Sequence, residues 1–276
     1  LCKAFGPPES LVLEERPSPP LQESQVRIAV RACGVNFPDI LIITGKYQFQ
    51  PPFPFAPGSE VAGDVIEVGA KVSRLAVGDR VMGMCGWNGF ATEVVLGEAS
   101  CLKLPASMDY ETGSAISMTY GTSYYALKQR AQLKAGETLL VHGATGGVGT
   151  AAVDLGRVMG ARVIATGGSD DNLRRVQEAY GIEHAVNYVT DPQWKDTVKA
   201  LTGGKGADVI YDPVGGDVFE NSLRCVAIDG RLLVIGFTSG TIPAAKANLI
   251  LLKSCSVVGV FWGPWNGRAP AESRAT

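Results

Sequence analysis

The sequence has neither an excess of basic residues nor a long apolar run. Its 276 residues carry 25 lysines and arginines against 27 acidic residues, which gives a formal charge of −2. Proteins that bind nucleic acid or anionic membranes usually present a basic patch, so no nucleic-acid partner is expected. No apolar segment approaches the roughly 20 residues that a transmembrane helix requires, so no membrane partner is expected either.

Histidine is scarce, and the cysteines are scattered. The six cysteines stand apart from one another, at Cys2, Cys33, Cys85, Cys101, Cys225 and Cys255. Because they lack paired spacing in a chain of this size, they indicate thiols in a reducing compartment rather than disulfides, and we predict a cytoplasmic location. The two histidines, His142 and His184, have no evident partner that would make either a general base, so we expect structural roles for both.

The most informative segment is residues 139–149, with the sequence LLVHGATGGVG. A short apolar run is followed by a glycine-rich turn and an amphipathic helix, and a second apolar strand follows at 161–167. In such a β-α-β unit the glycines let the backbone approach a pyrophosphate, and the helix N-terminus offers free N–H groups. We therefore predict a dinucleotide site at Ala144, Thr145, Gly146, Gly147 and Val148.

The end of the second strand indicates which dinucleotide is favoured. An acidic residue there normally binds the ribose hydroxyls of NAD, but this chain has Gly167, Gly168 and Ser169. A 2′-phosphate would find donors in the Ser169 hydroxyl and nearby N–H groups, with Arg174 or Arg175 in range for charge pairing. Either arginine alone is more typical of a solvated helix face. The pattern favours NADPH over NADH.

Two kinds of pattern divide the chain near Tyr110. Before it, short strands are separated by glycine and proline turns, which is typical of a β-rich barrel. These strands are expected at 25–32, 60–68, 79–84 and 92–95. After it, helical segments alternate with apolar strands, which predicts a parallel sheet covered by helices. Those strands are expected at 137–143, 161–167, 185–188, 207–212 and 230–236, with another at the sheet edge at 256–262.

Several further motifs occur in order along the chain. They are CGVNFPD at 33–39, GKY at 45–47, PFAPGSE at 54–60 with Gly63, GDRV at 78–81, GT at 121–122, NY at 187–188 and DPVGG at 212–216. Together with the phosphate turn, they make nearly the whole chain resemble the medium-chain dehydrogenase/reductase superfamily. Within it, the chain is similar to the zinc-independent quinone oxidoreductases related to zeta-crystallin.

The resemblance implies an α/β protein with two domains. A GroES-like β-barrel catalytic domain would occupy 1–118, and a Rossmann domain with a doubly wound parallel sheet would occupy 119–262 and bind NADPH. Residues 263–276 would begin a return to the catalytic domain. Family members continue further and this chain opens at Leu1, so we expect both ends to be incomplete. A homodimer through the edge strand from Ser256 to Trp262 is also implied.

The resemblance also implies functional roles for individual residues. Two positions that hold catalytic zinc in related alcohol dehydrogenases are Asn36 and Ser59 here, and the four-cysteine lobe of their structural zinc has no counterpart, so no metal is expected. Asn36, Tyr47 and Thr122 would lie near the nicotinamide and substrate in positioning and oxyanion roles, supported by Asp39. Further cofactor contacts are expected at Gly167, Gly168, Ser169, Tyr188, Gly236 and Phe237.

Without a Lewis acid, the hydride acceptor must itself be strongly electrophilic. The resemblance therefore implies NADPH-dependent reduction of quinones by hydride transfer in a cleft between the domains. Two alternatives stay open: a reductase of the C=C bond of enones, enals or enoyl thioesters, and a non-catalytic NADPH-binding module. Tyr124 and Lys128 have the spacing of the proton-transfer pair of short-chain dehydrogenases, but they precede the phosphate turn, so we interpret them as part of a connecting helix.

Overall fold

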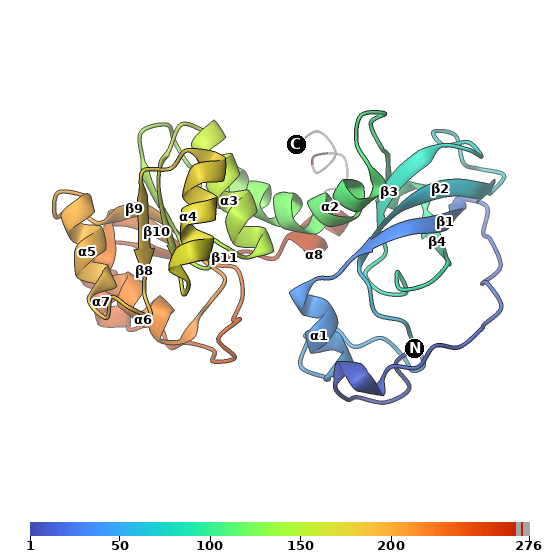
Figure 1. The fold of residues 1–276 in the computed structure, drawn as a ribbon, viewed down its shortest axis with the longest axis horizontal. Coiled ribbons are helices and arrows are strands. Elements are labelled where there is room, and N and C mark those ends of the chain that lie inside the picture. Colours follow the sequence, from blue (N-terminus) through green and yellow to red (C-terminus); the bar gives the residue numbers. More distant parts are fainter. Residues whose placement is uncertain (269–271, 273–276) are drawn as a thin grey trace. The chain divides into compact units, whose positions relative to one another are not determined.

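The computed structural model describes residues 1–268 and 272 (Figure 1). The chain divides into two compact units, Leu1–Met118 and Thr119–Thr276, and the division falls within helix α2 (Tyr110–Tyr124). In the described part of the chain, no helix combines the length and the apolar character needed to cross a bilayer. Residues 269–271 and 273–276 lie outside the described residues, so the return of the chain expected at 263–276 stays a prediction.

The first unit is built on a five-stranded antiparallel sheet. Its strands are β1 (Gln25–Gly34), β2 (Glu60–Val68), β3 (Arg80–Met84), β4 (Glu93–Gly97) and β5 (Cys101–Lys103), in the order β4-β1-β2-β3-β5. Alternate residues of β1 and β2, among them Val26, Ile28 and Val61, point into one apolar core, as the period of two along a strand requires. Helix α1 (Phe37–Ile43) follows β1, and single 3₁₀ turns lie at Pro8–Ser10 and Glu98–Ser100. The β-rich first half predicted from the sequence is confirmed.

The second unit is built on a six-stranded parallel sheet. Its strands are β6 (Thr138–Val141), β7 (Arg162–Gly167), β8 (His184–Asn187), β9 (Ala207–Asp212), β10 (Val226–Val234) and β11 (Ser256–Gly259), in the order β11-β10-β9-β6-β7-β8. The strand order reverses between β6 and β9, as in a doubly wound sheet. The parallel sheet predicted from the sequence is confirmed.

Helices cover both faces of this sheet because its strands are apolar on both faces. Neighbouring residues Leu140 and Val141 of β6 enter separate cores. The core around Val141 includes the π-helix Tyr125–Arg130, α3 (Gly147–Val158) and α4 (Asp170–Tyr180). The core around Leu140 includes α5 (Trp194–Leu201), α6 (Gly216–Cys225) and α7 (Ala247–Lys253). Continuous apolar strands with a core on each side are typical of parallel sheets.

The last strand is shorter than the sequence predicts. The apolar run suggests a strand through Trp262, but β11 ends at Gly259 and helix α8 (Trp262–Arg268) begins at Trp262. Pro264 lies in the first turn of α8, where a missing backbone N–H costs little because that group has no intrahelical acceptor. Trp265 of α8 stacks on Tyr125, with ring centroids 4.6 Å apart. The aromatic residues therefore pack against a helix of the same unit instead of extending the strand.

His142 is a buried structural residue that follows β6. Its Nδ1 lies 2.7 Å from Thr166 Oγ1 and its Nε2 lies 2.8 Å from Ser222 Oγ. Burial lowers the pKa of His142 to about 3, so the ring is neutral at physiological pH. The ring joins β6 to β7 and to α6, in agreement with the structural role expected from the sequence.

Asp212, at the carboxyl end of β9, is a buried carboxylate that is only partly hydrogen-bonded. The residue is 1% exposed. Oδ1 accepts hydrogen bonds from the backbone N–H groups of Val214 (2.7 Å) and Gly215 (3.0 Å), whereas Oδ2 has no partner among the described residues. Burial raises the pKa of Asp212 from 3.8 to about 6, against the lowering effect of the two N–H donors.

The raised pKa of Asp212 predicts that the protein loses stability as pH rises through this range. The folded state binds the proton more tightly than the unfolded state, so the stabilising contribution is present below pH 3.8 and is lost as pH rises to about 6. Relative to Asp212→Asn, the unmodified protein should lose about 2 kcal/mol of unfolding free energy between about pH 4.5 and about pH 8. Urea unfolding at both pH values measures this difference.

The exposed Asp217 on α6 provides the control for this measurement. Asp217→Asn should follow the unmodified protein at both pH values. An equal pH dependence for Asp212→Asn and the unmodified protein would contradict the role assigned to Asp212.

Candidate functional site

In the first unit, the predicted site residues gather where β1 passes into α1. Asn36 is the N-cap of α1, and its backbone N–H donates to Asp39 Oδ2 at 2.8 Å. The Asp39 backbone N–H donates in return to the backbone carbonyl of Asn36 at 3.0 Å. Pro38 in the first turn fits this arrangement because proline lacks only an N–H that the helix does not use. The segment NFPD therefore fixes the backbone of Asn36.

Asp39 also connects α1 to the loop before β2. It is 2% exposed, and its Oδ1 accepts a hydrogen bond from the Gly58 N–H at 3.0 Å. Burial raises the pKa of Asp39, while the N–H groups of Asn36 and Gly58 lower it. The sequence prediction that Asp39 supports Asn36 stays a prediction about function, but the two residues are in direct contact.

Glu60, the first residue of β2, is a second buried carboxylate beside Asn36. It is 1% exposed. Its Oε1 accepts a hydrogen bond from Asn36 Nδ2 at 2.8 Å, and its Oε2 accepts one from the Met118 N–H at 2.9 Å. Burial raises the pKa of Glu60, the hydrogen bonds lower it, and the nearby Asp39 raises it again. Asn36 is thus held through its backbone by Asp39 and through its side chain by Glu60.

Tyr47 is half-buried in the same unit. It packs against the apolar cluster of Cys2, Ile42, Ile43 and Phe55. Burial raises the pKa of Tyr47, and the Asp39 carboxylate raises it further. A phenol with a raised pKa stays protonated at physiological pH and can donate a hydrogen bond. Tyr47 therefore combines an apolar ring with an O–H donor near Asp39.

The side chains at the two positions expected for zinc ligands do not fit a metal. Asn36 is bound to Glu60, and Ser59 is 3% exposed with an Oγ that has no hydrogen-bond partner among the described residues. Burial raises the pKa of the nearby Cys33 thiol to about 12, so it is not a thiolate. Within residues 1–268 and 272, no three His, Cys, Asp or Glu side chains are grouped as metal ligands. Amide, hydroxyl and protonated thiol groups are poor zinc donors.

Thr122, the fourth predicted catalytic residue, belongs to the second unit. It is half-buried on α2, directly after Gly121. A Cβ atom on Gly121 would lie 2.6 Å from the Trp262 ring, so α8 packs tightly against this turn of α2. The described structure therefore groups Asn36, Asp39 and Tyr47 in one unit and sets Thr122 on a helix of the other.

The phosphate turn joins β6 to the N-terminus of α3. Gly143 has a φ of +56°, and a Cβ atom on Gly149 would lie 2.1 Å from the Gly143 carbonyl oxygen, so only glycine allows the helix to approach the turn this closely. Thr145, Gly146 and Gly147 are exposed at the start of this 12-residue helix. The first N–H groups of a helix have no intrahelical acceptor. The turn therefore fits a dinucleotide phosphate, with Ala144 and Val148 flanking it.

The remaining predicted cofactor residues lie at or follow the carboxyl ends of β7, β8 and β10. Tyr188 donates its backbone N–H to the Gly167 carbonyl at 3.2 Å, and its ring would lie 3.9 Å from a Cβ on Gly168. Gly236 and Phe237 follow β10, and Phe237 packs beside Gly215, the N-cap residue of α6. These residues lie along the carboxyl edge of the sheet on both sides of the reversal between β6 and β9, and dinucleotides bind at this edge in such folds.

The residues expected to receive a 2′-phosphate also make local contacts of their own. Ser169 is the N-cap of α4, and its Oγ accepts a hydrogen bond from the Asn172 N–H at 3.4 Å. Arg174 forms an ion pair with Asp171 at 3.0 Å. The Ser169 hydroxyl thus caps α4 as an acceptor and keeps its own hydrogen to donate, and Arg174 lies in an exposed ion pair, so the 2′-phosphate site stays a prediction.

Two residues with clear structural roles were part of motifs but had no role in the sequence analysis. Glu60 lies in PFAPGSE and Asp212 lies in DPVGG. Glu60 begins β2 and Asp212 ends β9, so each is an acidic residue at one terminus of an apolar strand, and this is the signal that could have identified them. Both are 1% exposed, and buried carboxylates are rare unless they have a specific function or partner.

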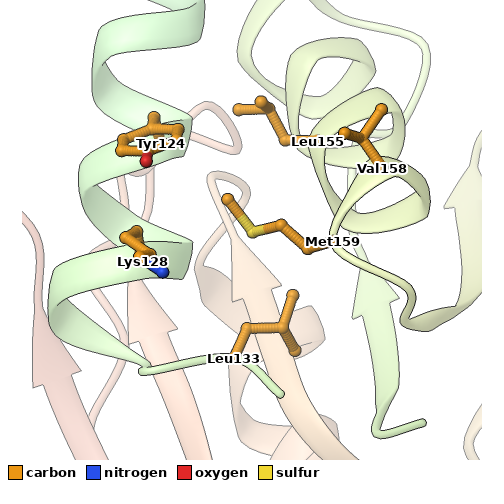
Figure 2. A pocket seen from close by; sticks show the side chains of 6 residues that line it. All are labelled: Tyr124, Lys128, Leu133, Leu155, Val158 and Met159. Carbon is orange, nitrogen blue, oxygen red and sulfur yellow. The ribbon is translucent and has the colours of Figure 1, made fainter. Parts of the chain in front are cut away.

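Tyr124 and Lys128 lie on one wall of a shallow pocket of about 270 Å³ in the second unit. Figure 2 shows these two side chains on one helix, facing Leu155, Val158 and Met159 at the end of α3, with Leu133 beside them. The pocket is at the C-terminal end of α3, whereas the phosphate turn is at its N-terminus. The tyrosine-lysine pair is therefore separate from the predicted dinucleotide site, as its place in the sequence suggested.

Comparison with known proteins agrees with this organisation. A family described as "Alcohol dehydrogenase GroES-like domain" matches residues 22–106, and one described as "Zinc-binding dehydrogenase" matches 147–274. Quinone oxidoreductase-like protein 2 homolog of Nematostella vectensis is 45% identical over 98% of this chain and 73% of that relative. Among solved structures, Escherichia coli quinone oxidoreductase complexed with NADPH is 29% identical, with a TM-score of 0.91 over 99% of this chain and 84% of that chain.

CurK enoyl reductase is similar as well, at 25% identity and a TM-score of 0.88, over 99% of this chain and 83% of that chain. The GroES-like and Rossmann-like halves follow the order expected of one superfamily, and the zinc positions hold Asn36 and Ser59. The chain belongs to the zinc-independent, quinone oxidoreductase-like branch of the medium-chain dehydrogenase/reductase superfamily, a family of oxidoreductases.

Proposed function

We propose that the protein uses NADPH to reduce quinones by hydride transfer. The observation that carries this proposal is the exposed glycine turn at the N-terminus of α3, where the Gly149 Cα packs too closely on Gly143 for any side chain. The similar Escherichia coli protein is a quinone oxidoreductase complexed with NADPH. Gly167 and Gly168, which end and follow β7, offer no carboxylate to the adenosine ribose, and this supports NADPH over NADH.

The side chains of the first unit suit an electrophile that needs no metal. When bound, NADPH supplies the hydride. Tyr47 would donate its phenolic hydrogen to the carbonyl oxygen that becomes negative as the hydride is accepted, since its raised pKa keeps it protonated. Asn36 would orient the bound molecules from its fixed place at the start of α1. Thr122 remains a candidate for the same positioning role.

The cofactor and substrate are tested together by following NADPH absorbance in the near ultraviolet under anaerobic conditions. An ortho-quinone or a para-quinone should be reduced, and NADPH should be preferred over NADH by about tenfold or more, because charge-assisted hydrogen bonds contribute about 1.5–3 kcal/mol. No turnover of either quinone by protein that binds NADPH would contradict the proposal.

Reduction of a C=C bond is the second candidate, since the structure of CurK enoyl reductase is similar over nearly the whole chain. A 2-alkenal in the same assay separates the two reactions. Faster turnover of the alkenal than of either quinone would assign C=C reduction. Binding of NADPH without turnover of any of the three compounds would support a non-catalytic module.

Tyr47→Phe tests the proposed hydrogen-bond donor. Removing a donor to a developing oxyanion typically lowers kcat by about 100-fold, and NADPH affinity should change little. Stopped-flow absorbance and a cofactor titration measure the two quantities.

Tyr110→Phe is the matched control, because the Tyr110 hydroxyl instead donates to Asp64 at 2.6 Å on the sheet. This variant should lose about 1 kcal/mol of stability and keep its kcat. Unchanged turnover in Tyr47→Phe would remove the donor role from Tyr47.

We also propose a homodimer through β11. Among the described residues this strand pairs only with β10, so its outer edge is open to another strand. Sedimentation equilibrium should give twice the chain mass of 29.0 kDa. A mass that stays at 29.0 kDa across micromolar concentrations would reject the dimer.

A reducing compartment, and specifically the cytoplasm, stays a prediction. All six cysteines are free thiols, and the Cys85 and Cys225 thiols have pKa values raised by burial. Such thiols are inert, which suits a role in packing.

A further inference from the structure

The carboxylate of Glu60 is satisfied by N–H donors, and one of them belongs to the candidate residue Asn36. Oε1 accepts from Asn36 Nδ2 at 2.8 Å and Oε2 accepts from the Met118 N–H at 2.9 Å. The backbone N–H of Ser117 also stabilises the ionised carboxylate and lowers its pKa. With the residue only 1% exposed, water does not compete for these bonds. An ionised carboxylate can only accept hydrogen bonds, so the nitrogen of the Asn36 amide must face Glu60.

We propose that Glu60 is a positioning residue that sets which atoms of the Asn36 amide are presented to bound ligands. The backbone of Asn36 is already fixed, because its N–H donates to Asp39. The remaining freedom is rotation of the side-chain amide, and the bond to Glu60 removes it. Asn36 then presents its carbonyl oxygen Oδ1 and one remaining N–H hydrogen in a constant orientation.

This assignment rests on the proposed function and gives Tyr47 and Asn36 different hydrogen-bonding roles toward a bound molecule. Tyr47 carries the O–H donor, whereas Asn36 contributes an acceptor whose direction Glu60 determines. An acceptor at Oδ1 suits a hydroxyl or an amide N–H of a bound molecule, and it repels a negatively charged oxygen. Glu60 would therefore favour one binding orientation over its reverse.

A purely structural role for Glu60 makes a different prediction. Glu98 in the same unit illustrates such a role, since its Oε1 accepts backbone N–H bonds from Ser73 and Leu75 and supports a loop. If Glu60 only tied Met118 to β2, its removal would lower stability without involving Asn36. The two roles are separated by testing whether the effects of Glu60 and Asn36 are independent.

The experiment is a double-mutant cycle on the full chain. Glu60→Gln replaces one acceptor oxygen with a donor, so the Asn36 side-chain amide either loses its hydrogen bond or rotates by about 180°. In either case kcat for the quinone should fall by about 10- to 100-fold. Asn36→Ala should cause a similar or larger loss. The double variant should match Asn36→Ala alone, because Glu60 acts through Asn36. If the loss of kcat in the double variant equals the sum of the two single losses on a free-energy scale, the proposal is overturned. Glu98→Gln is the control and should keep its kcat.

A second readout does not depend on turnover. In ¹⁵N-labelled protein, the Asn36 side-chain N–H signals are identified by their absence in Asn36→Ala. One of them should exchange slowly with solvent in the unmodified protein and in Glu98→Gln, and rapidly in Glu60→Gln. Slow exchange that persists in Glu60→Gln would overturn the proposal, whereas absent quinone turnover with the expected exchange pattern would overturn only the proposed function.

If Glu60→Gln alone does not fold, the double variant Asn36→Asp with Glu60→Gln, which exchanges the amide and the carboxylate, tests the same contact. In this pair the amide introduced at position 60 could donate to the carboxylate introduced at position 36 and still accept from the Met118 N–H, so folding should recover. Failure of the pair to recover the stability lost in Glu60→Gln would also overturn the contact on which the proposal depends.

Discussion

Two carboxylates, Asp39 and Glu60, are buried in the first unit and stabilised by neutral N–H donors instead of cations among the described residues. Removing a charge from water costs several kcal/mol unless hydrogen bonds replace its hydration. Those bonds come from Asn36, Gly58 and Met118, which lie on three separate segments. The loop before α1, the loop before β2 and the middle of α2 must therefore all be in place together. The candidate site and the packing of this unit depend on the same few atoms.

The second unit holds a buried carboxylate at the carboxyl edge of its sheet by different means. Asp212 is held by the turn that follows it, through the N–H groups of Val214 and Gly215. These donors bind only one oxygen, and the other stays without a partner among the described residues. The carboxyl edge of the sheet therefore retains a polar group whose hydrogen bonding is incomplete, on the same edge as the glycine turn. A buried group left without a partner requires an explanation, and a ligand that supplies the missing bond is one of them.

The sequence was sufficient to predict the structure where that structure depends on residues adjacent along the chain. The apolar run of β6, the glycine turn and the start of α3 are all contained in residues 139–149, and their order predicted a dinucleotide fold. The contacts of Glu60 could not be predicted in this way, because Asn36 and Met118 are 24 and 58 residues away. The predicted end of β11 was wrong because Phe261 and Trp262 continue an apolar pattern, and only packing of α8 on Tyr125 and Gly121 distinguishes helix from strand there.

The contacts of His142 also favour one tautomer. Ser222 Oγ donates its hydrogen to the Val218 carbonyl at 2.7 Å, whereas the Thr166 hydroxyl lies farther, 3.3 Å, from the Val141 carbonyl. The shorter bond favours Ser222 as an acceptor toward the ring, with the ring hydrogen on Nε2. Nδ1 then has a free lone pair and accepts from the Thr166 hydroxyl at 2.7 Å. In this tautomer the hydrogen bonds run in one direction, from β7 through the imidazole to α6. An asparagine or glutamine could supply one donor and one acceptor here, but neither has a rigid ring that holds them on opposite sides, so this position selects for histidine without using its acid-base chemistry.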